Sequence, residues 1–308
     1  MRKTTATLMA AMVFAFTSPA FTNWELSFGK EDQRVGVAAP MNEQDAPDGP
    51  ASYRVVNGNL WVLDSVKGRV ICFTGDNKLS QTVIFPTLKS EFILSDFALQ
   101  LSSAGEVQAI VTIDTRAKEI VVVDATGKEL RRIKADAMTQ LDEVDIDGEG
   151  RIYVGDYAAG SVSVFAADGQ MQRSFPWQVS GFVTDQQNNL HMLDYKEGSG
   201  HALVTLAADG KEIARHELGM PEMQNPRIWS VSANGERLVS MVPPSGNPSA
   251  QILCTISADG KVKAKADFTN PYYINRYLAA GDGNAWLVKA DYLKAPAQPV
   301  IIEPLNLK

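Results

Sequence analysis

Acidic residues recur at matching positions along this chain, each near the end of a short apolar run. Each of the six apolar runs follows a turn. Aligned by counting from these turns, the last residues of the runs are Asp64, Asp114, Asp156, Asp194, Val242 and Lys289. Carboxylates gathered at one level could bind Ca²⁺ or Mg²⁺, or the hydroxyl and amine groups of a ligand. Asp in such places also accepts hydrogen bonds from backbone N–H groups of the following turn, and that role would recur just as regularly. Both interpretations stay open from the residues alone.

A second, less regular set of side chains stands where the innermost predicted strands begin. It combines both charges with aromatic rings: Asp96, Asp142, Glu143, Arg227, Trp229, Arg276 and Tyr277. Tyr157 and Tyr195 directly follow two of the aspartates above and add aromatic rings at that level. This mixture suits a carboxylate-like or sugar-like small molecule, or the end of a peptide. The same residues could instead line a wet channel.

The residues do not form a catalytic signature. The three histidines, His191, His201 and His216, stand at different places on neighbouring predicted strands, so they are not expected to converge. A zinc site or a histidine general base is therefore not predicted. The sequence also has no Gly-x-Ser-x-Gly and no His-Glu-x-x-His.

The elements that carry these residues follow from a repeated turn. Gly-containing or Asn-containing turns before short apolar runs recur at intervals of roughly 40 to 50 residues, the length of a four-stranded propeller blade. Their centres are Gly58, Gly105, Gly148, Asn188, Gly235 and Gly283. A second series of hairpin turns interleaves with the first, at Gly75, Gly127, Gly169, Gly210 and Gly260. The pattern predicts an all-β fold, a six-bladed β-propeller with four-stranded antiparallel blades. A β-sandwich is the alternative, but it would not explain the matched turns.

The second series has one member fewer than the first, because the last unit stops after three predicted strands. Residues 24–29 near the N-terminus are similar to the outer strand of the third unit at 173–176. We therefore expect this N-terminal strand to complete the last blade and close the ring. In the fifth unit, the proline-rich residues 243–248 could rim a pocket, contact a partner or form a solvated insertion.

Once aligned, the units resemble NHL-type repeats of bacterial six-bladed propellers. The resemblance is carried best by residues 49–64 with 68–73, and by residues 147–157. It implies a propeller with a binding face at one mouth of its channel. It does not imply one activity, because this scaffold hosts lyases, lactonases, dehydrogenases and binding proteins.

Composition and the first residues limit the partners and the compartment. The chain has 308 residues, a net charge of −7 and an isoelectric point near 5.1, without the basic stripe that a nucleic acid would require. Arg2 and Lys3 precede an apolar run at 8–16 and a small-residue site at 18–20. This order predicts a signal peptide at 1–20, without a lipid-anchor cysteine, before a single propeller domain at 21–308. A buried helix or a retained anchor is the alternative.

These observations favour a periplasmic or extracellular protein that does not span the membrane. They favour a module that binds a small molecule, a protein or a peptide through one mouth of the channel. The alternative is a hydrolase or lyase of the lactonase-like type that depends on a divalent metal, with Ca²⁺ or Mg²⁺ held by carboxylates. The two cysteines, Cys72 and Cys254, fall in strands of different blades and are expected to stay unpaired.

Overall fold

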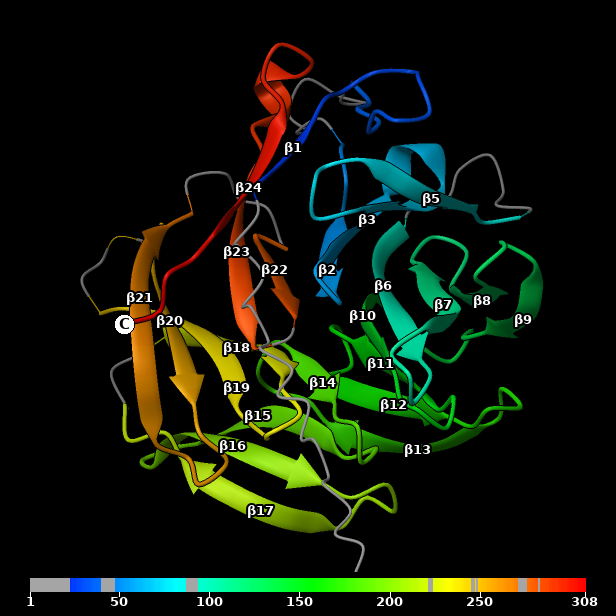
Figure 1. Cartoon of the computed structure of the whole chain (residues 1–308). Coiled ribbons are helices and arrows are strands. Elements are labelled where there is room, and N and C mark those ends of the chain that lie inside the picture. Colours follow the sequence, from blue (N-terminus) through cyan, green and yellow to red (C-terminus); the bar gives the residue numbers. More distant parts are fainter. Residues whose placement is uncertain are drawn as a thin grey trace, which may run out of the picture.

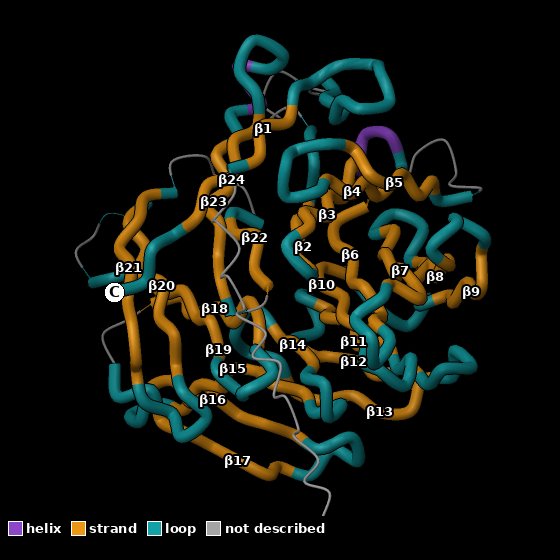
Figure 2. Tube along the Cα trace, in the orientation of Figure 1, coloured by secondary structure: helices purple, strands orange, loops and turns teal. Residues whose placement is uncertain are grey.

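The computed structural model describes residues 23–39, 48–86, 94–220, 224–244, 247, 249–270, 276–281 and 283–308. The predicted signal peptide lies outside these residues, as do 245, 246 and 248 of the proline-rich loop. Within the described part, loops join short strands, and helix is confined to the single turns η1 (Ser65–Lys67) and η2 (Tyr292–Lys294) (Figure 2). None of the helices described is long and apolar enough to cross a membrane.

Four separate antiparallel sheets of four strands account for the middle of the chain. We call them units two to five. Unit two has β6 (Leu94–Leu101), β7 (Val107–Asp114), β8 (Glu119–Asp124) and β9 (Glu129–Lys134). Unit three has β10 (Leu141–Ile146), β11 (Ile152–Asp156), β12 (Ser161–Phe165) and β13 (Met171–Pro176). Unit four has β14 (Phe182–Thr184), β15 (Leu190–Lys196), β16 (Gly200–Leu206) and β17 (Glu212–Glu217). Unit five has β18 (Gln224–Val231), β19 (Arg237–Val242), β20 (Ala250–Ile256) and β21 (Val262–Thr269).

The two ends of the chain share one sheet of eight strands, in the order β1-β24-β23-β22-β2-β3-β4-β5. Unit one is the half with β2 (Ser52–Val56), β3 (Asn59–Asp64), β4 (Arg69–Phe73) and β5 (Leu79–Ile84). Unit six is the half with β22 (Leu278–Gly281), β23 (Asn284–Lys289), β24 (Val300–Pro304) and β1 (Trp24–Leu26).

The sheets are arranged like the blades of a propeller, with the first strand of each unit nearest the centre (Figure 1). The all-β, propeller-like prediction is confirmed, but the sheets are not six separate ones. Strands β2 and β22 join the two end units through one parallel bridge, Arg54↔Ala280. Gly281 permits this approach, because a Cβ there would collide with the carbonyl oxygen of Val55.

The N-terminal strand closes the ring as predicted. Strand β1 pairs antiparallel with β24, with Trp24 opposite Ile302 and Leu26 opposite Val300. Trp24 is buried and meets the ring of Trp286 edge-on at 5.6 Å between centroids. The closing strand is therefore part of the core as well as of the sheet.

Apolar side chains fill the spaces between neighbouring units. One such cluster packs Leu63 and Val70 of unit one against Phe97 and Ile110 of unit two. The free thiols Cys72 and Cys254 are buried in two different clusters of this kind. With the spaces between units filled by apolar groups, the buried charges are found near the centre and at a few junctions.

Candidate functional site

The inner strands begin with irregular pairing at the end of the channel where the predicted charged residues stand. Register shifts occur in β6 between Leu94 and Phe97, and in β10 between Leu141 and Glu143. Strand β18 has two further shifts, on either side of Arg227. A β-bulge inserts an extra residue into one strand and re-aims its side chain. Asp96, Asp142 and Trp229 lie within these bulges.

Asp96 is the hub of a charged cluster that we call the mouth network: Arg54, Asp96, Asp142, Glu143, Arg227 and Arg276. The Asp96 carboxylate is fully buried and accepts hydrogen bonds from Ser52 Oγ at 2.7 Å, Arg54 Nη2 at 2.9 Å and the Val144 amide at 3.1 Å. It also pairs with Arg276. The donors come from units one and three and from the segment before β22, so this one carboxylate ties three other units together.

The surroundings of Asp96 keep it ionised. Burial alone would raise its pKa, but the guanidinium groups of Arg276 and Arg54 and the Ser52 and Val144 donors outweigh that effect. The net result is a pKa below the ordinary value for Asp.

Glu143 receives ion pairs from two other units. Arg227 Nη2 of unit five lies 2.6 Å from Glu143 Oε1, and Arg276 Nη2 lies 3.6 Å from Oε2. Because Glu143 is in unit three, the bond to Arg227 passes over unit four in the order of units. The mouth network therefore connects units that are not sequence neighbours.

Aromatic rings hold Arg227 from the other side. Its guanidinium lies 4.8 Å from the ring centroid of Trp229, which meets Tyr277 edge-on at 4.9 Å. Trp229 Nε1 donates to Ser240 Oγ at 2.8 Å, and the Tyr277 hydroxyl is 2.9 Å from the same oxygen. The Arg227 guanidinium is thus held by the Glu143 carboxylate at Nη2 and by the Trp229 ring that lies over its plane.

Two groups of the mouth network are left without hydrogen-bond partners among the described residues. Arg227 Nε is buried and has no acceptor. Asp142, the extra residue of the β10 bulge, has no donor, and burial with the nearby Glu143 raises its pKa despite Arg276 and Arg227. The cluster thus leaves the Asp142 carboxylate open to solvent, whereas Arg227 Nε is enclosed by the protein.

Asp145 lies further along β10 and was not predicted. Its Oδ2 accepts the Thr184 amide at 2.6 Å and the Thr184 hydroxyl at 3.0 Å. Burial by the surrounding protein raises its pKa to about 6, although these donors and Arg54 oppose the shift. The side chain retains some solvent access.

The predicted aspartates at the strand ends make bonds of their own. Asp114 accepts the Arg116 and Ala117 amides at 3.1 and 2.9 Å, as expected for an Asp that caps the following turn. Asp64 instead holds the N-terminal segment through the Gly36 amide at 2.9 Å, and Asp156 binds the Thr139 amide at 2.6 Å. The interpretation of a cap for the following turn therefore holds for Asp114 and also for Asp156, which accepts the Ala159 amide at 3.2 Å, but not for Asp64.

The remaining members of that set face outward or pair locally. Asp194 binds Arg215 at 2.8 Å, and Lys289 pairs with Glu303. Tyr157 and Tyr195 are exposed, at 63% and 47% of their surface. Across the described ranges, no three His, Cys, Asp or Glu side chains are grouped so as to hold a metal ion.

The structure therefore brings together one of the two predicted sets. Those that meet are Asp96, Asp142, Glu143, Arg227, Trp229, Arg276 and Tyr277. The other predicted residues make their bonds, or expose their side chains, outside the mouth network: Asp64, Asp114, Asp156, Tyr157, Asp194, Tyr195 and Lys289. Arg54 was missed, although a charge inside the apolar run of β2 was a usable signal.

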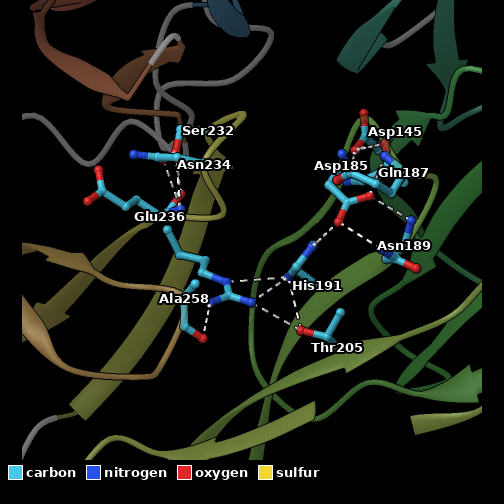
Figure 3. Close-up of polar contacts among 12 residues, drawn as sticks. Asp145, Asp185, Gln187, Asn189, His191, Thr205, Ser232, Asn234, Glu236 and Ala258 are labelled. Carbon is cyan, nitrogen blue, oxygen red and sulfur yellow. Dashed lines mark hydrogen bonds and ion pairs between the residues drawn. The ribbon is translucent and has the colours of Figure 1, made fainter. Parts of the chain in front are cut away.

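A second polar cluster, the junction cluster, joins units four and five: Asp185, His191, Thr205 and Arg237. Figure 3 labels Asp185, His191 and Thr205 of this cluster. His191 Nε2 lies 2.8 Å from Asp185 Oδ2, and its Nδ1 lies 3.1 Å from Thr205 Oγ1. Arg237 Nε and Nη2 both point to the same Nδ1 at 3.4 Å. Because a guanidinium only donates, Nδ1 must accept, and the imidazole proton sits on Nε2 toward Asp185.

This row of carboxylate, imidazole and hydroxyl has the order of residues that can activate a hydroxyl nucleophile. Here the nitrogen that would take the hydroxyl proton already accepts from Arg237. Thr205 is also buried, with 5% of its surface exposed. The junction cluster is therefore an inter-unit contact rather than a reactive group.

Comparisons with known proteins bear on the fold. No family model matches the chain, and no curated protein sequence matches it. Among solved structures, Kuenenia stuttgartiensis hydrazine synthase is similar with a TM-score of 0.54 and 14% identity, over 81% of this chain and 76% of that one. A streptogramin B lyase is similar with a TM-score of 0.52 and 11% identity, over 94% of this chain and 98% of that one. A DUF4221 family member from Bacteroides vulgatus is similar with a TM-score of 0.55 and 11% identity, over 92% of this chain and 96% of that one.

The chain has a β-propeller fold. Identities this low establish the architecture of the propeller and leave its activity to be argued from its own residues. The resemblance of the propeller to the NHL type stays a prediction.

Proposed function

We propose that this propeller is a binding module that takes a small polar ligand at the mouth formed by the starts of its inner strands. The observation that carries the proposal is the Asp142 carboxylate, which is half-buried and receives no hydrogen bond from the described residues, inside a cluster whose Asp96 and Glu143 carboxylates are paired. An unpaired carboxylate that is open to solvent beside buried ion pairs suggests a polar site that a ligand can complete.

In this proposal the eight-stranded sheet acts as two blades joined by a single bridge, which makes six blades of the NHL-like kind. The charged and then apolar start of the chain supports a periplasmic or extracellular location. The mixed charges at the mouth support a ligand with polar groups of more than one kind.

A thermal-shift panel on the mature chain tests the proposal. The probes are free amino acids, short peptides, glucose, N-acetylglucosamine, citrate, CaCl₂ and MgCl₂, each at millimolar concentration. We expect at least one organic probe to raise Tm in the wild type but not in Asp142→Asn or Arg227→Gln. The exposed variant Asp136→Asn is the control, and it should respond like the wild type.

Two results would overturn the binding module. One is that no organic probe raises Tm. The other is that Ca²⁺ or Mg²⁺ alone raises it in an Asp142-dependent way, which would favour the metal-dependent hydrolase or lyase instead.

A further inference from the structure

The last residues of the sequence cross from unit six to unit five, and we call residues 305–308 the strap. Leu305 still belongs to unit six, where its amide donates to the Ala285 carbonyl at 2.9 Å. Lys308 reaches β21, the outermost strand of unit five, and Figure 1 shows the C-terminal end beside that strand. Leu305 and Leu307 pack against the apolar cluster between the two units, whereas the other two strap residues are exposed. The strap is thus a short segment held at the edge of another unit's sheet.

The strap uses only one position on the edge of β21. The Lys265 amide donates to the Lys308 carbonyl oxygen at 2.9 Å, and the Lys308 amide donates to the Lys265 carbonyl oxygen at 3.0 Å. Two residues that exchange both bonds form a hydrogen-bonded antiparallel pair. Backbone groups alternate in direction along a strand, so those of Asp267 and Thr269 also point away from β20. They have no backbone partner among the described residues. An added strand can therefore pair at all three positions, where the strap pairs at one.

The two side chains of this pair repel each other. Directly opposite residues of an antiparallel pair project from the same face, with Cβ atoms about 5 Å apart, and like charges there are destabilising. Lys265 and Lys308 are both exposed, and neither forms an ion pair with another described residue. Asp267 is exposed two residues further along the same face and is likewise without an ion pair in the described part of the chain. The strap is therefore a weak occupant of an edge that carries one free charge of each sign.

We propose that the edge of β21 is a strand-addition site for an extended polypeptide segment, which displaces the strap. Added strands bind through main-chain hydrogen bonds, and their alternate side chains provide the specificity. Running antiparallel to β21, as the strap does, the segment places a carboxylate opposite Lys265 and a cation opposite Asp267. The side chains between these positions point to the face of Phe268, toward the cluster that now receives Leu305 and Leu307, and are apolar.

Two peptides of equal composition test the proposal: acetyl-Thr-Leu-Lys-Leu-Glu-amide and acetyl-Thr-Leu-Glu-Leu-Lys-amide. In the register of the strap, the first places Glu opposite Lys265 and Lys opposite Asp267, and the second places like charges at both positions. Isothermal titration of the mature chain at low ionic strength measures both. We expect the first peptide to bind about tenfold more tightly than the second.

Variants of the exposed charges locate the site without disturbing the core. Lys308→Glu turns the repelling pair into an attractive one, so the strap should compete better and weaken binding of the first peptide on the order of threefold. Lys196→Glu makes the same change at an exposed residue of β15 and should leave binding unchanged. Lys265→Glu combined with Asp267→Lys exchanges the two charges at constant net charge and should reverse the preference between the peptides.

The proposal is wrong if neither peptide binds at millimolar concentration, since the lysines of β21 then only protect an exposed edge from pairing. Equal binding of the two peptides to the wild type also contradicts it, because the charges opposite β21 would not be read. A preference that survives the exchange of charges places the peptide elsewhere on the molecule. These outcomes are independent of the mouth network, whose residues lie on and before the inner strands.

Discussion

The mouth network and the junction cluster each contain a buried arginine between units of the propeller, and they differ in how the nitrogen atoms of that arginine are hydrogen-bonded. In the junction cluster every nitrogen of Arg237 has an acceptor: His191 for Nε, the Ser257 and Ala258 carbonyls at 3.2 and 3.1 Å for Nη1, and Thr205 with His191 for Nη2. In the mouth network Arg227 Nε has none, and Asp142 has no donor.

This difference separates a structural role from a binding role better than burial or charge does. Both clusters are buried, both contain arginine and carboxylate, and both connect units. A fully matched cluster makes one geometry rigid and has nothing left for a ligand. A cluster with a leftover donor and acceptor is either costly or completed from outside.

Removing the hub of the mouth network should have the largest effect on stability. Asp96→Ala leaves buried Arg276 with only the more distant Glu143 carboxylate and half-buried Arg54 without its ion-pair partner, so we expect a loss of about 3 to 5 kcal/mol in the free energy of unfolding. Urea unfolding followed by circular dichroism measures it, with exposed Asp136→Ala as the control. A loss similar to that of the control would mean that the bonds to Asp96 do not hold the units together.

Removing the arginine of the junction cluster should cost less and leave the mouth intact. Arg237→Leu fills part of the space but removes the Arg237 donor from the Ala258 carbonyl and one of two donors from the Ser257 carbonyl, at a cost of about 2 to 3 kcal/mol. Binding of any mouth ligand should be unchanged below the unfolding transition, as measured by titration. A variant that lost ligand affinity would show that the two regions are coupled, contrary to the comparison.

The pH dependence of stability should contain a contribution from Asp145 in the mouth channel. Its folded pKa is about 6, above the value near 4 of an unfolded Asp, so between these pH values the folded state holds the extra proton. Stability from this group is therefore fully present below about pH 4 and is lost as pH rises through about 6.

Comparison with Asp145→Asn isolates this contribution. Because the side chain keeps some solvent access, we expect the wild type to lose about 1 to 2 kcal/mol more than the variant between pH 4 and 7. The measurement is the free energy of unfolding at several pH values for both chains. Parallel curves would show that Asp145 is ionised in the fold much as it is in the unfolded chain.

The fold was predictable from sequence because its signal repeats. Turn residues such as Gly148 and Gly169 recur with the blade, and the missing last strand could be assigned to the segment around Trp24. The joining of β2 and β22 was not predictable, since it depends on how closely two backbones approach at Gly281.

The candidate site was predicted only where charge stood at the start of an inner strand, as with Asp96 and Arg276. Asp145 was missed because it lies inside a strand, where the alternation of side chains hides a charge that faces the channel, whereas Arg54 was missed although it interrupts the apolar run of β2. The regular aspartates were recognised but do not form one cluster, since those at the ends of β3, β7 and β11 lie on second strands, farther from the centre than the inner strands whose charges meet (Figure 1). Bulges such as that at Asp142 shift the side chains out of the simple alternation, and no sequence period reports them.

The smallest expected effect on stability is also the sharpest test of the comparison. Asp142→Asn removes a carboxylate that has no hydrogen-bond donor and whose pKa is raised by burial and by Glu143, so its charge is disfavoured in the fold. We expect the free energy of unfolding at neutral pH to stay within about 0.5 kcal/mol of the wild type, or to rise slightly. The same replacement in the junction cluster, Asp185→Asn, replaces one of two accepting oxygens by an NH₂ group, so either His191 Nε2 or the Gln187 and Asn189 amides lose their acceptor, which should cost about 1 to 3 kcal/mol. Parallel urea titrations of the two variants give the contrast directly. If Asp142→Asn costs as much as Asp185→Asn, Asp142 is a structural group like its counterpart, and the mouth loses the unused acceptor on which its binding role depends.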